Sequence, residues 1–558
     1  MDKDHNVLDE FQEEIAKRII KEYDSSRRFW LFADDVGVGK TIMYITVNQH
    51  AAEQRERIGG KRHMTFVFSM SSSLKEQAEK IRATDTRIPN NPFIKPTDIL
   101  IFDGDKETRD SLLMAIQAIR PKYVLANYAK LNLHPKEFLE LMDEDTSLIL
   151  DEIDLYHNND SMTSQIITGL CCVVHARWLA TATMVANKID SLHPLLMYAD
   201  PGQAVVEEVE THVGKVMMPQ TSESQEFGGM THFLNRYGLF DGQKLAGVSR
   251  PKELRERLLR WGASITDADD VLDIDVAPPE TRKDPLAPGQ AVIYQAIKDG
   301  IKNWIDENEY EYLRSSGGER IKFEMQLLAQ IVYGRRASAL PPYDFKLAEM
   351  KNLAIRAAKA GHRKKDDVMG KLEWATLPND RQSAKLDAAC KIVEEFDFSK
   401  GGVAFYSEWT AVARALERQL KERGLDKHGL GLITGEESDA ERQATRLGVK
   451  YGNIKVCIIS DAGGRSLDLF QLSTLVVLTP PWCHSQVEQA VGRIKRRGQK
   501  NTVRVIYLAA DSTVETKKML SIIGQKGKVA DSVRYGDRGK RTSPLMGLDS
   551  LSQVLAWL

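Results

Sequence analysis

The chain has 558 residues, enough for several domains with cores of ordinary size. Lysine and arginine number 77 and aspartate and glutamate 79, a formal net charge of −2, which excludes a general attraction to polyanions. Any nucleic-acid binding therefore requires a local basic surface. The five cysteines favour a reducing compartment. Because no secretory signal and no apolar run of roughly 20 residues is visible, we expect a soluble intracellular protein, cytoplasmic or nuclear according to its host.

Short apolar runs alternate with amphipathic stretches over the first two hundred residues. The stretches between the runs, such as 73–81 and 110–119, have the pattern of helices. Buried strands that alternate with helices predict a parallel α/β sheet. The predicted strands are 29–33, 66–70, 99–105, 123–128, 147–152 and 178–183.

The alternation lapses from about residue 200 to about residue 380, where charged segments with a helical pattern dominate. It then resumes, with helices again predicted between the apolar runs. We therefore predict two α/β lobes with a helical insertion between them. The strands predicted for the second lobe are 403–407, 430–435, 456–460, 474–480 and 503–509.

The segment GVGKT follows the first predicted strand and opens a helix, which is the context of a phosphate-binding loop. Lys40 would neutralise the β and γ phosphates of ATP, and the Thr41 hydroxyl would bind Mg²⁺. A chance glycine turn is the alternative, because Asp34 stands where the pattern GxxxxGK[ST] has its first glycine. The backbone N–H groups expected to point at phosphate oxygens are those of Gly37, Val38, Gly39, Lys40 and Thr41.

The apolar run LILDEID, residues 148–154, ends in adjacent carboxylates. Asp151 is placed to hold Mg²⁺ through water, and Glu152 can accept a proton from the attacking water as a general base. The alternative is an ordinary strand-to-helix turn with solvated acids. The phosphate-loop motif upstream favours the catalytic interpretation.

A basic run, QAVGRIKRRGQ, occupies residues 489–499. Such a run is usually a solvated face or a nucleic-acid patch. The spacing of Gln489, Arg493 and Arg496 is i, i+4 and i+7, which predicts that all three share one helical face. Two guanidinium groups on that face could contact a single triphosphate, the arginine-finger arrangement.

Together these motifs resemble those of the Swi/Snf-type ATPases of superfamily 2, helicase-like motors that translocate on double-stranded DNA. That family writes its phosphate loop as ADEMGLGKT, with an acidic pair where this chain has Asp34 and Asp35. Gln499 completes an RxGQ ending that separates the family from most superfamily 2 relatives. The resemblance covers about residues 8 to 530. Its further segments are DEIDLYHN (151–158), LATATMVANKIDSL (179–192), LAPGQAVIY (286–294), SAKL (383–386), SDAGGRSLDL (460–469), WCHSQVEQAVGRIKRRGQ (482–499) and TVE (513–515).

The resemblance implies roles for individual side chains. Gln12 lies where the family has its adenine-reading glutamine, and Asp468, in place of the usual Asn, and Gln489 are assigned to the nucleotide site. Asp154 replaces a histidine of the acidic motif, so we expect coupling between hydrolysis and the DNA site to differ here. The residues expected to link the two sites are Thr181, Thr183, Gly463 and Gly464.

The resemblance also implies two RecA-like parallel-sheet lobes with helical protrusions inserted between them. ATP and Mg²⁺ are expected between the phosphate loop of lobe one and the arginines of lobe two. The expected domains are lobe one (1–200), the protrusions and linker with the end of lobe one (201–380), lobe two (381–512) and a brace-like C-terminal extension (513–558).

The expected function is ATP-dependent translocation on duplex DNA, without sequence preference, by a monomeric motor that remodels or displaces DNA-bound proteins. One alternative is a strand-separating DNA or RNA helicase; the RxGQ ending argues against it and Asp154 argues for it. A non-hydrolysing nucleic-acid-binding scaffold is the other, and intact Lys40, Glu152 and Arg493 argue against it. Cys171, Cys172 and His175 are close in sequence but lack a second ligand pair, so we expect them in the core.

Overall fold

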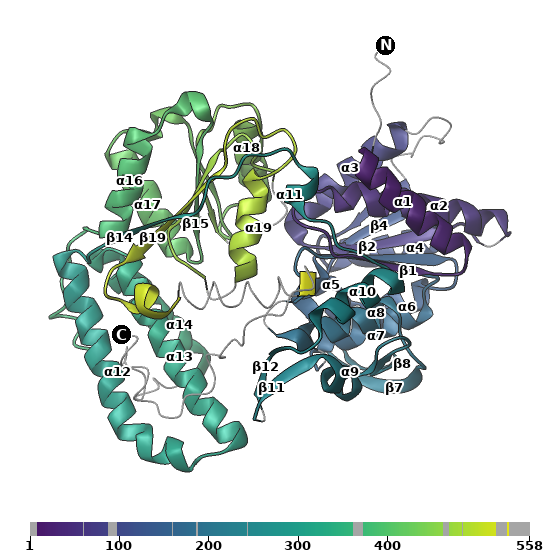
Figure 1. The fold of residues 1–558 in the computed structure, drawn as a ribbon, viewed down its shortest axis with the longest axis horizontal. Helices are drawn as coiled ribbons and strands as arrows, with labels where there is room; N and C mark the ends of the chain where they lie inside the picture. The colour runs from purple at the N-terminus through teal and green to yellow at the C-terminus, as the bar shows by residue number, and fades with distance from the viewer. Residues whose placement is uncertain are drawn as a thin grey trace. The chain divides into compact units, whose positions relative to one another are not determined.

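The computed structural model describes residues 8–59, 61–87, 98–158, 160–185, 188–242, 244–360, 372–460, 468–481, 484–519 and 533–534. These residues form two compact units. The first runs to Asp273 and includes residues 533–534, and the second begins at Ile274. Each unit is built on a parallel β-sheet covered by helices (Figure 1), which confirms the predicted α/β fold class.

The first unit has a seven-stranded sheet in which all neighbouring strands are parallel. Because parallel strands end at the same edge, the segments that follow β1, β5 and β6 meet there. Its strands, in spatial order, are β13 (Ala263–Ser264), β1 (Phe29–Phe32), β6 (Ala176–Ala180), β5 (Thr146–Asp151), β2 (Met64–Ser69), β4 (Tyr123–Asn127) and β3 (Ile99–Phe102).

Helices cover both faces of this sheet. The face against α1, α2, α3 and α11 receives Trp30 and Phe32 of β1, whereas Phe29 and Leu31 point to the opposite face. The helices are α1 (Glu10–Asp24), α2 (Lys40–Arg57), α3 (Leu74–Arg87), α4 (Lys106–Ile119), α5 (Ala129–Leu133), α6 (Pro135–Leu141), α7 (Met162–Val173), α8 (His193–Ala199), α9 (Met230–Tyr237), α10 (Pro251–Trp261) and α11 (Ala268–Val271).

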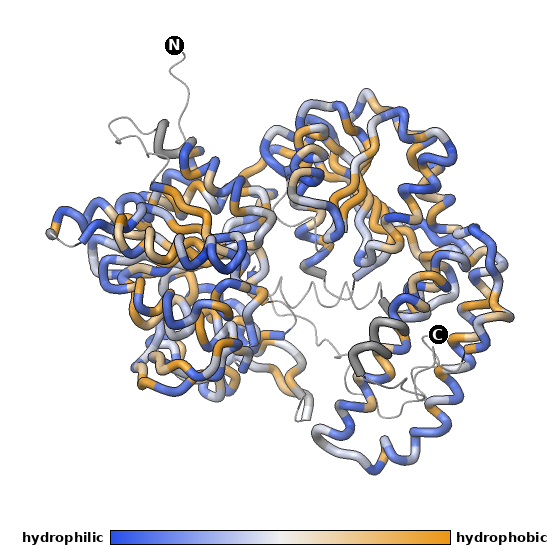
Figure 2. The backbone as a smooth tube through the Cα atoms, turned by 180° about the vertical axis from the view of Figure 1, so that it is seen from behind, coloured by the Kyte–Doolittle hydropathy of each residue, from blue (hydrophilic) through white to orange (hydrophobic). Residues whose placement is uncertain are grey.

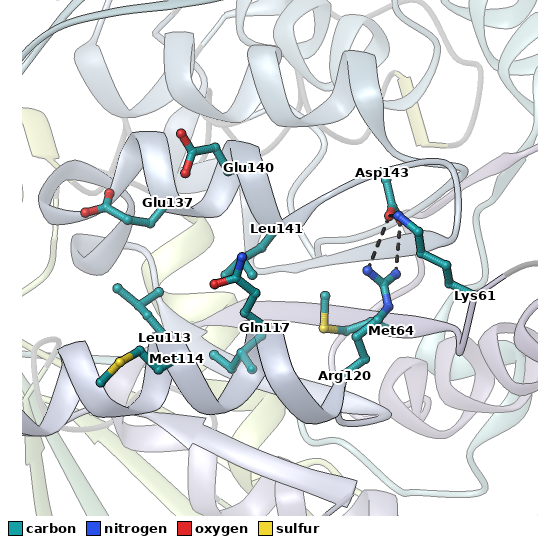
Figure 3. A pocket seen from close by; sticks show the side chains of 11 residues that line it. Lys61, Met64, Leu113, Met114, Gln117, Arg120, Glu137, Glu140, Leu141 and Asp143 are labelled. Atoms are coloured by element: carbon teal, nitrogen blue, oxygen red, sulfur yellow. Dashed lines mark hydrogen bonds and ion pairs between the residues drawn. The ribbon is translucent and has the colours of Figure 1, made fainter.

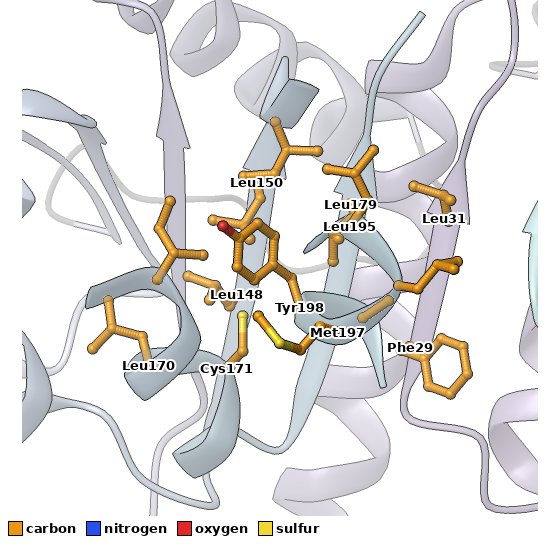
Figure 4. Close-up of a cluster of buried hydrophobic side chains, with 14 of the residues drawn as sticks. Phe29, Leu31, Leu148, Leu150, Leu170, Cys171, Leu179, Leu195, Met197 and Tyr198 are labelled. Atoms are coloured by element: carbon orange, nitrogen blue, oxygen red, sulfur yellow. The ribbon is translucent and has the colours of Figure 1, made fainter. Parts of the chain in front are cut away.

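The core of the first unit explains why its strands were visible in the sequence. Figure 4 shows Leu148 and Leu150 of β5 beside Leu31 and Leu179, with side chains of α7 and α8 packed over them. A strand buried on both faces needs an apolar residue at nearly every position. The central strands are accordingly hydrophobic along their length (Figure 2), which is the pattern that predicted them.

The segment after α8 differs from the expectation that helical segments dominate residues 200–380. It contains three antiparallel strand pairs before α10. In the longest pair the first strand is exposed from Val205 to Glu208 and buries only Val209 and Thr211, and Gly214, with φ +107°, opens the return strand. Short, exposed, charged strands have no apolar run to reveal them. The pairs are β7 (Val205–Thr211) with β8 (Gly214–Gln220), β9 (Glu223–Ser224) with β10 (Gly228–Gly229), and β11 (Gly238–Asp241) with β12 (Lys244–Val248).

The second unit has a six-stranded sheet, again with all neighbouring strands parallel. All five strands predicted for this lobe are present. The sixth, β14, was missed because its sequence, ETRKD, is polar throughout, as an edge strand permits. The strands, in spatial order, are β14 (Glu280–Asp284), β19 (Arg504–Ala510), β18 (Thr474–Val477), β15 (Val403–Ser407), β17 (Val456–Ser460) and β16 (Leu430–Ile433).

Long helices precede the central strands of the second unit, as the charged segments predicted. Three of them, α12 to α14, share one hydrophobic cluster with α16, α17 and the sheet. In the described part of the chain, no helix has both the length and the apolar character to cross a bilayer. The helices are α12 (Pro288–Arg314), α13 (Gly317–Ala339), α14 (Pro342–Ala360), α16 (Ala384–Glu395), α17 (Thr410–Glu422), α18 (Asp439–Lys450) and α19 (His484–Ile494).

Candidate nucleotide site

The loop between β1 and α2 has the backbone of a phosphate-binding turn. Gly37 and Gly39 both have φ +88°, in the left-handed region that glycine adopts without strain. A Cβ atom at Gly39 would overlap the Gln12 side-chain amide, so position 39 has no room for a side chain. Lys40 begins helix α2, and its amide therefore belongs to a helix N-terminus, which favours anions.

Gln12 fastens this loop to helix α1. Its side chain is buried, its Nε2 donates to the Val38 carbonyl at 2.6 Å, and its Oε1 accepts from the Asp9 amide at 3.0 Å. Gln12, which the resemblance assigns to adenine recognition, thus also holds the backbone of the phosphate loop in place. Adenine recognition by Gln12 stays a prediction.

The Lys40 side chain is folded back onto its own loop. Its Nζ donates to the carbonyl oxygens of Asp34 and Asp35, each at 2.9 Å. Burial lowers the pKa of Lys40, and the negative charges of Glu152 and Asp34 oppose that shift. The Lys40 ammonium therefore lies among carboxylates and carbonyl oxygens. Phosphate oxygens of a bound nucleotide could replace these carbonyl oxygens as its hydrogen-bond acceptors.

Asp34 and Asp35, which precede the glycines, form hydrogen bonds with a segment more than two hundred residues downstream. Asp34 is fully buried and accepts from the Ser264 hydroxyl at 2.6 Å and the Thr266 amide at 2.9 Å. Burial raises the pKa of Asp34, while those hydrogen bonds act to lower it. Asp35 accepts from the Val36 amide at 2.9 Å, and its own amide donates to the Thr266 carbonyl at 2.9 Å. The acidic pair therefore anchors the phosphate loop to β13 and the turn after it.

The second pair of carboxylates ends β5, close to the same loop. Asp151 accepts from the Gln77 amide at 2.5 Å and from the Ser69 hydroxyl at 3.3 Å. Burial, followed by the charge of Glu152, raises the pKa of Asp151 to about 7, and the nearby Lys40 lowers it. Gln77 and Ser69 were missed from the sequence, because only the adjacency of β2 and β5 brings them to Asp151.

Glu152 has an unusual backbone conformation and a buried carboxylate oxygen without a donor among the described residues. Its backbone is left-handed, with φ +54°, which is uncommon for a non-glycine residue and is often found at functional sites. Its Oε2 is buried and has no hydrogen-bond partner among the described residues. A buried carboxylate oxygen without a donor suits a water molecule or a bound ligand. With Asp151 and the Thr41 hydroxyl, the donor set consists of oxygen atoms, the type that Mg²⁺ prefers.

Of the two threonines predicted to couple the sites, Thr181 contacts the acidic motif directly and Thr183 contacts Thr181. The Thr181 hydroxyl donates to Asp154 Oδ1 at 2.9 Å, and the Thr183 amide donates to Thr181 Oγ1 at 2.9 Å. Asp154, which departs from the family's histidine, thus links the end of β5 to the end of β6. The other coupling residues, Gly463 and Gly464, lie outside the described residues.

The helical-face argument for the arginines of the second unit is wrong for Arg496. Helix α19 ends at Ile494, so Arg496 lies in the turn beyond it. Gly498, with φ +95°, follows in that turn, and the Gln499 side chain donates to the Ile494 carbonyl at 3.1 Å, satisfying an end of the helix. Gln499, which marked the family in the sequence, therefore closes this turn.

Two arginines of the run have different surroundings. Arg493, on α19, is buried with 2% of its surface exposed, and its carbonyl accepts from the Leu469 amide at 2.9 Å. Arg496 is half-buried, donates its Nε–H to the Gly492 carbonyl at 2.9 Å and forms an ion pair with Asp468. The structure thus joins Arg496 to Asp468, two residues predicted for the nucleotide site. Gln489 is half-buried on α19.

Other candidate groups have structural roles. Cys171 is buried in the core, and the His175 ring shares a hydrogen bond with the Tyr23 hydroxyl at 2.8 Å. Within the described residues, no group of three or more His, Cys, Asp or Glu side chains is arranged to hold a metal. The expectation of a core position is met by Cys171, whereas Cys172 and His175 are only half-buried.

A separate hollow of about 400 Å³ lies between α4 and α6. Figure 3 shows Arg120 directed at Asp143 on its wall, with hydrogen bonds of 3.1 and 3.3 Å. Met64, which starts β2, also lines it. The hollow is therefore at the amino-terminal edge of the sheet, opposite the phosphate loop, and is not part of the nucleotide site.

Comparison with known proteins agrees with these features. Residues 11–337, more than half of the chain, match the SNF2-related domain, and residues 384–498 match the helicase conserved C-terminal domain. The chain therefore belongs to the SNF2-related family of helicase-like superfamily 2 ATPases, as its motifs predicted.

Several known proteins are similar to it. DNA repair protein RAD5 of Candida glabrata is 31% identical over 179 residues, which are 31% of this chain and 16% of RAD5. DNA excision repair protein ERCC-6-like 2 of Mus musculus is 22% identical over 552 residues, 92% of this chain and 34% of that protein. The chain thus spans only a minor part of either relative. The Sulfolobus solfataricus SWI2/SNF2 ATPase core in complex with dsDNA has 17% identity and a TM-score of 0.37, covering 96% of this chain and 94% of that one.

Proposed function

We propose that this protein is a DNA-stimulated ATPase that hydrolyses ATP and translocates along duplex DNA without sequence preference. The observation that carries the proposal is the meeting of Lys40, Asp151 and Glu152 at one edge of the first sheet, with Glu152 Oε2 buried and unbonded among the described residues. DNA as the polymer is supported by family membership and by the names of the RAD5 and ERCC-6-like 2 relatives, which are DNA repair proteins.

In this proposal the residues divide the work of phosphoryl transfer. The loop amides and Lys40 bind the phosphates, and Glu152 Oε2 takes the proton of the attacking water. Thr41 and Asp151 would hold Mg²⁺, which neutralises charge on the phosphate oxygens when bound. Gln77 and Ser69 orient Asp151 through their hydrogen bonds.

The second unit contributes positive charge to the reaction. We assign this role to Arg493 and Arg496, and the Asp468 ion pair holds Arg496 in a defined position. Arginine fingers act on the transition state more than on the bound nucleotide. Hydrolysis would then require both units, while nucleotide binding would require mainly the first.

The test is an ATPase assay without polymer and with duplex DNA, single-stranded DNA or RNA. We expect the greatest stimulation by duplex DNA of any sequence and a steep decline with added salt. Glu152→Gln should keep nucleotide binding and lower turnover by roughly 10²–10⁴. Unchanged turnover would show that Glu152 is not the base.

Translocation needs its own readout. The protein should displace the third strand of a DNA triplex in an ATP-dependent reaction, and should leave a blunt duplex paired. Efficient unwinding of a forked duplex without triplex displacement would favour a strand-separating helicase instead.

A further inference from the structure

Two residues near the C-terminus of the chain belong to the first unit. Val533 and Arg534 follow the last strand of the second sheet in sequence, yet they pack with the first unit. Val533 is fully buried in the hydrophobic cluster that covers one face of the first sheet. In Figure 1 this short yellow segment lies beside α10, and the Arg255 Nε–H of that helix donates to the Arg534 carbonyl at 2.5 Å.

The Arg534 guanidinium reaches the phosphate loop. Its Nη1 lies 3.5 Å from Asp35 Oδ1, and its Nη2 donates to the Thr266 carbonyl at 3.3 Å. Only 13% of its side chain is exposed. Arg534 therefore contacts both Asp35 and Thr266, the two residues whose hydrogen bond joins the phosphate loop to the turn after β13.

Asp35 is the residue through which this contact could act on nucleotide binding. Its carboxylate also accepts from the Val36 amide at 2.9 Å and from the Ala268 amide at 3.4 Å, and its carbonyl accepts from Lys40. Arg534 thus opposes a negative charge that lies next to the loop where a triphosphate would bind. It also shares the Thr266 carbonyl with the Asp35 amide, so it fixes the backbone that presents Lys40.

We propose that Arg534 is a positioning residue for nucleotide binding, acting through Asp35 and Thr266 on the phosphate loop. The proposal rests on the proposed ATPase function and extends it, because it makes the loop of the first unit depend on a segment that follows the second unit in the chain. Val533 anchors that segment by burial, and Arg534 supplies its charge.

The direct test is the affinity of the full chain for a fluorescent ATP analogue with Mg²⁺. Arg534→Ala should weaken binding about fivefold, the equivalent of one partly buried ion pair, with a much smaller change in kcat. Arg534→Lys, which keeps the charge, should recover part of the affinity. Arg250→Ala serves as the matched control, because Arg250 is exposed and lies 3.8 Å from its partner, Glu253, on the same unit.

A double-mutant cycle tests whether Asp35 transmits the effect. In an Asp35→Asn background, Arg534→Ala should change affinity less than twofold. Val533→Ser, which disturbs the anchor and leaves both charges intact, should weaken binding in the same direction as Arg534→Ala. Equal losses from Arg534→Ala in both backgrounds, or unchanged affinity in Arg534→Ala itself, would overturn the proposal.

Hydrogen exchange distinguishes a failure of this proposal from a failure of the proposed ATPase function. Without nucleotide, Arg534→Ala should speed amide exchange severalfold in peptides that cover residues 33–41 and 264–271, because the hydrogen bonds between these two segments open more often. Faster exchange together with no nucleotide binding by the unaltered protein would refute the ATPase function and retain the contact. Unchanged exchange in these peptides would refute the positioning role of Arg534.

Discussion

Lys385 and Glu515 form a buried ion pair whose disruption should destabilise the second unit. Their side chains are 1% and 0% exposed, with the Lys385 Nζ 2.5 Å from Glu515 Oε2. Glu515 also accepts from the Ser338 hydroxyl at 3.2 Å and from the Ala510 amide at 2.9 Å. The carboxylate therefore connects α13, α16 and the end of β19 at a single point.

Removing one member of this pair leaves the other charge buried and uncompensated. Such changes cost about 3–5 kcal/mol, so Glu515→Gln should lower the free energy of unfolding of the second unit by about that amount. The double variant Lys385→Met with Glu515→Leu buries no charge and should lose about 1–2 kcal/mol or less, because buried ion pairs barely recover their desolvation cost.

The assay is hydrogen exchange across a urea series, read on peptides from α16 and β19 so that the second unit is followed separately. Lys421→Ala, which removes an exposed i, i+4 pair with Glu417, is the control and should change stability by less than about 0.5 kcal/mol. If the double variant were as unstable as Glu515→Gln, the loss would come from packing and not from unpaired charge.

Three further predictions concern the site and its surroundings. Arg493→Ala should lower turnover at least about a hundredfold with little change in nucleotide affinity, whereas the exposed Arg497 should tolerate alanine; equal damage in steady-state ATPase assays would point to a DNA-contacting patch. Asp154→Ala removes one of the two acceptors of the Thr181 hydroxyl and should reduce stimulation by duplex DNA several-fold more than basal ATPase; a uniform loss would argue against coupling. Burial lowers the pKa of His63 from 6.5 to about 4, so the folded ring stays neutral while the unfolded ring takes up a proton. The stability of the first unit should therefore fall by up to about 3 kcal/mol as the pH drops from 6.5 to 4 in urea titrations, and His63→Gln should flatten that dependence.

The sheets and the two acidic motifs were predictable because their signals are local. A strand buried on both faces requires a continuous apolar run, and a phosphate loop requires glycines and a lysine at fixed spacing, so FWLF and GVGKT could be interpreted without any distant contact. The exposed strand pairs at 205–248 and the edge strand β14 carry no such run. They depend on a partner strand, and the sequence left them as helix or linker.

The residue at which α19 ends could not be predicted from the periodic spacing of its side chains. Arg496 continues the i, i+4, i+7 spacing of Gln489 and Arg493, and nothing in that spacing marks Ile494 as the last helical residue. Gly498 and the hydrogen bonds of the Gln499 side chain decide the ending, and these are contacts of the folded chain.

The sequence by itself determined that this chain has two parallel α/β lobes, a phosphate loop and a pair of carboxylates at the end of a buried strand. It also showed that Asp34 and Asp35 precede the loop, but not what they do. Only the tertiary structure brings Ser264 and Thr266 to Asp34, and Arg534 to Asp35. Hydrogen bonds and ion pairs between such distant residues leave no periodicity in the chain, because their partners are chosen by how the strands are ordered in the sheet.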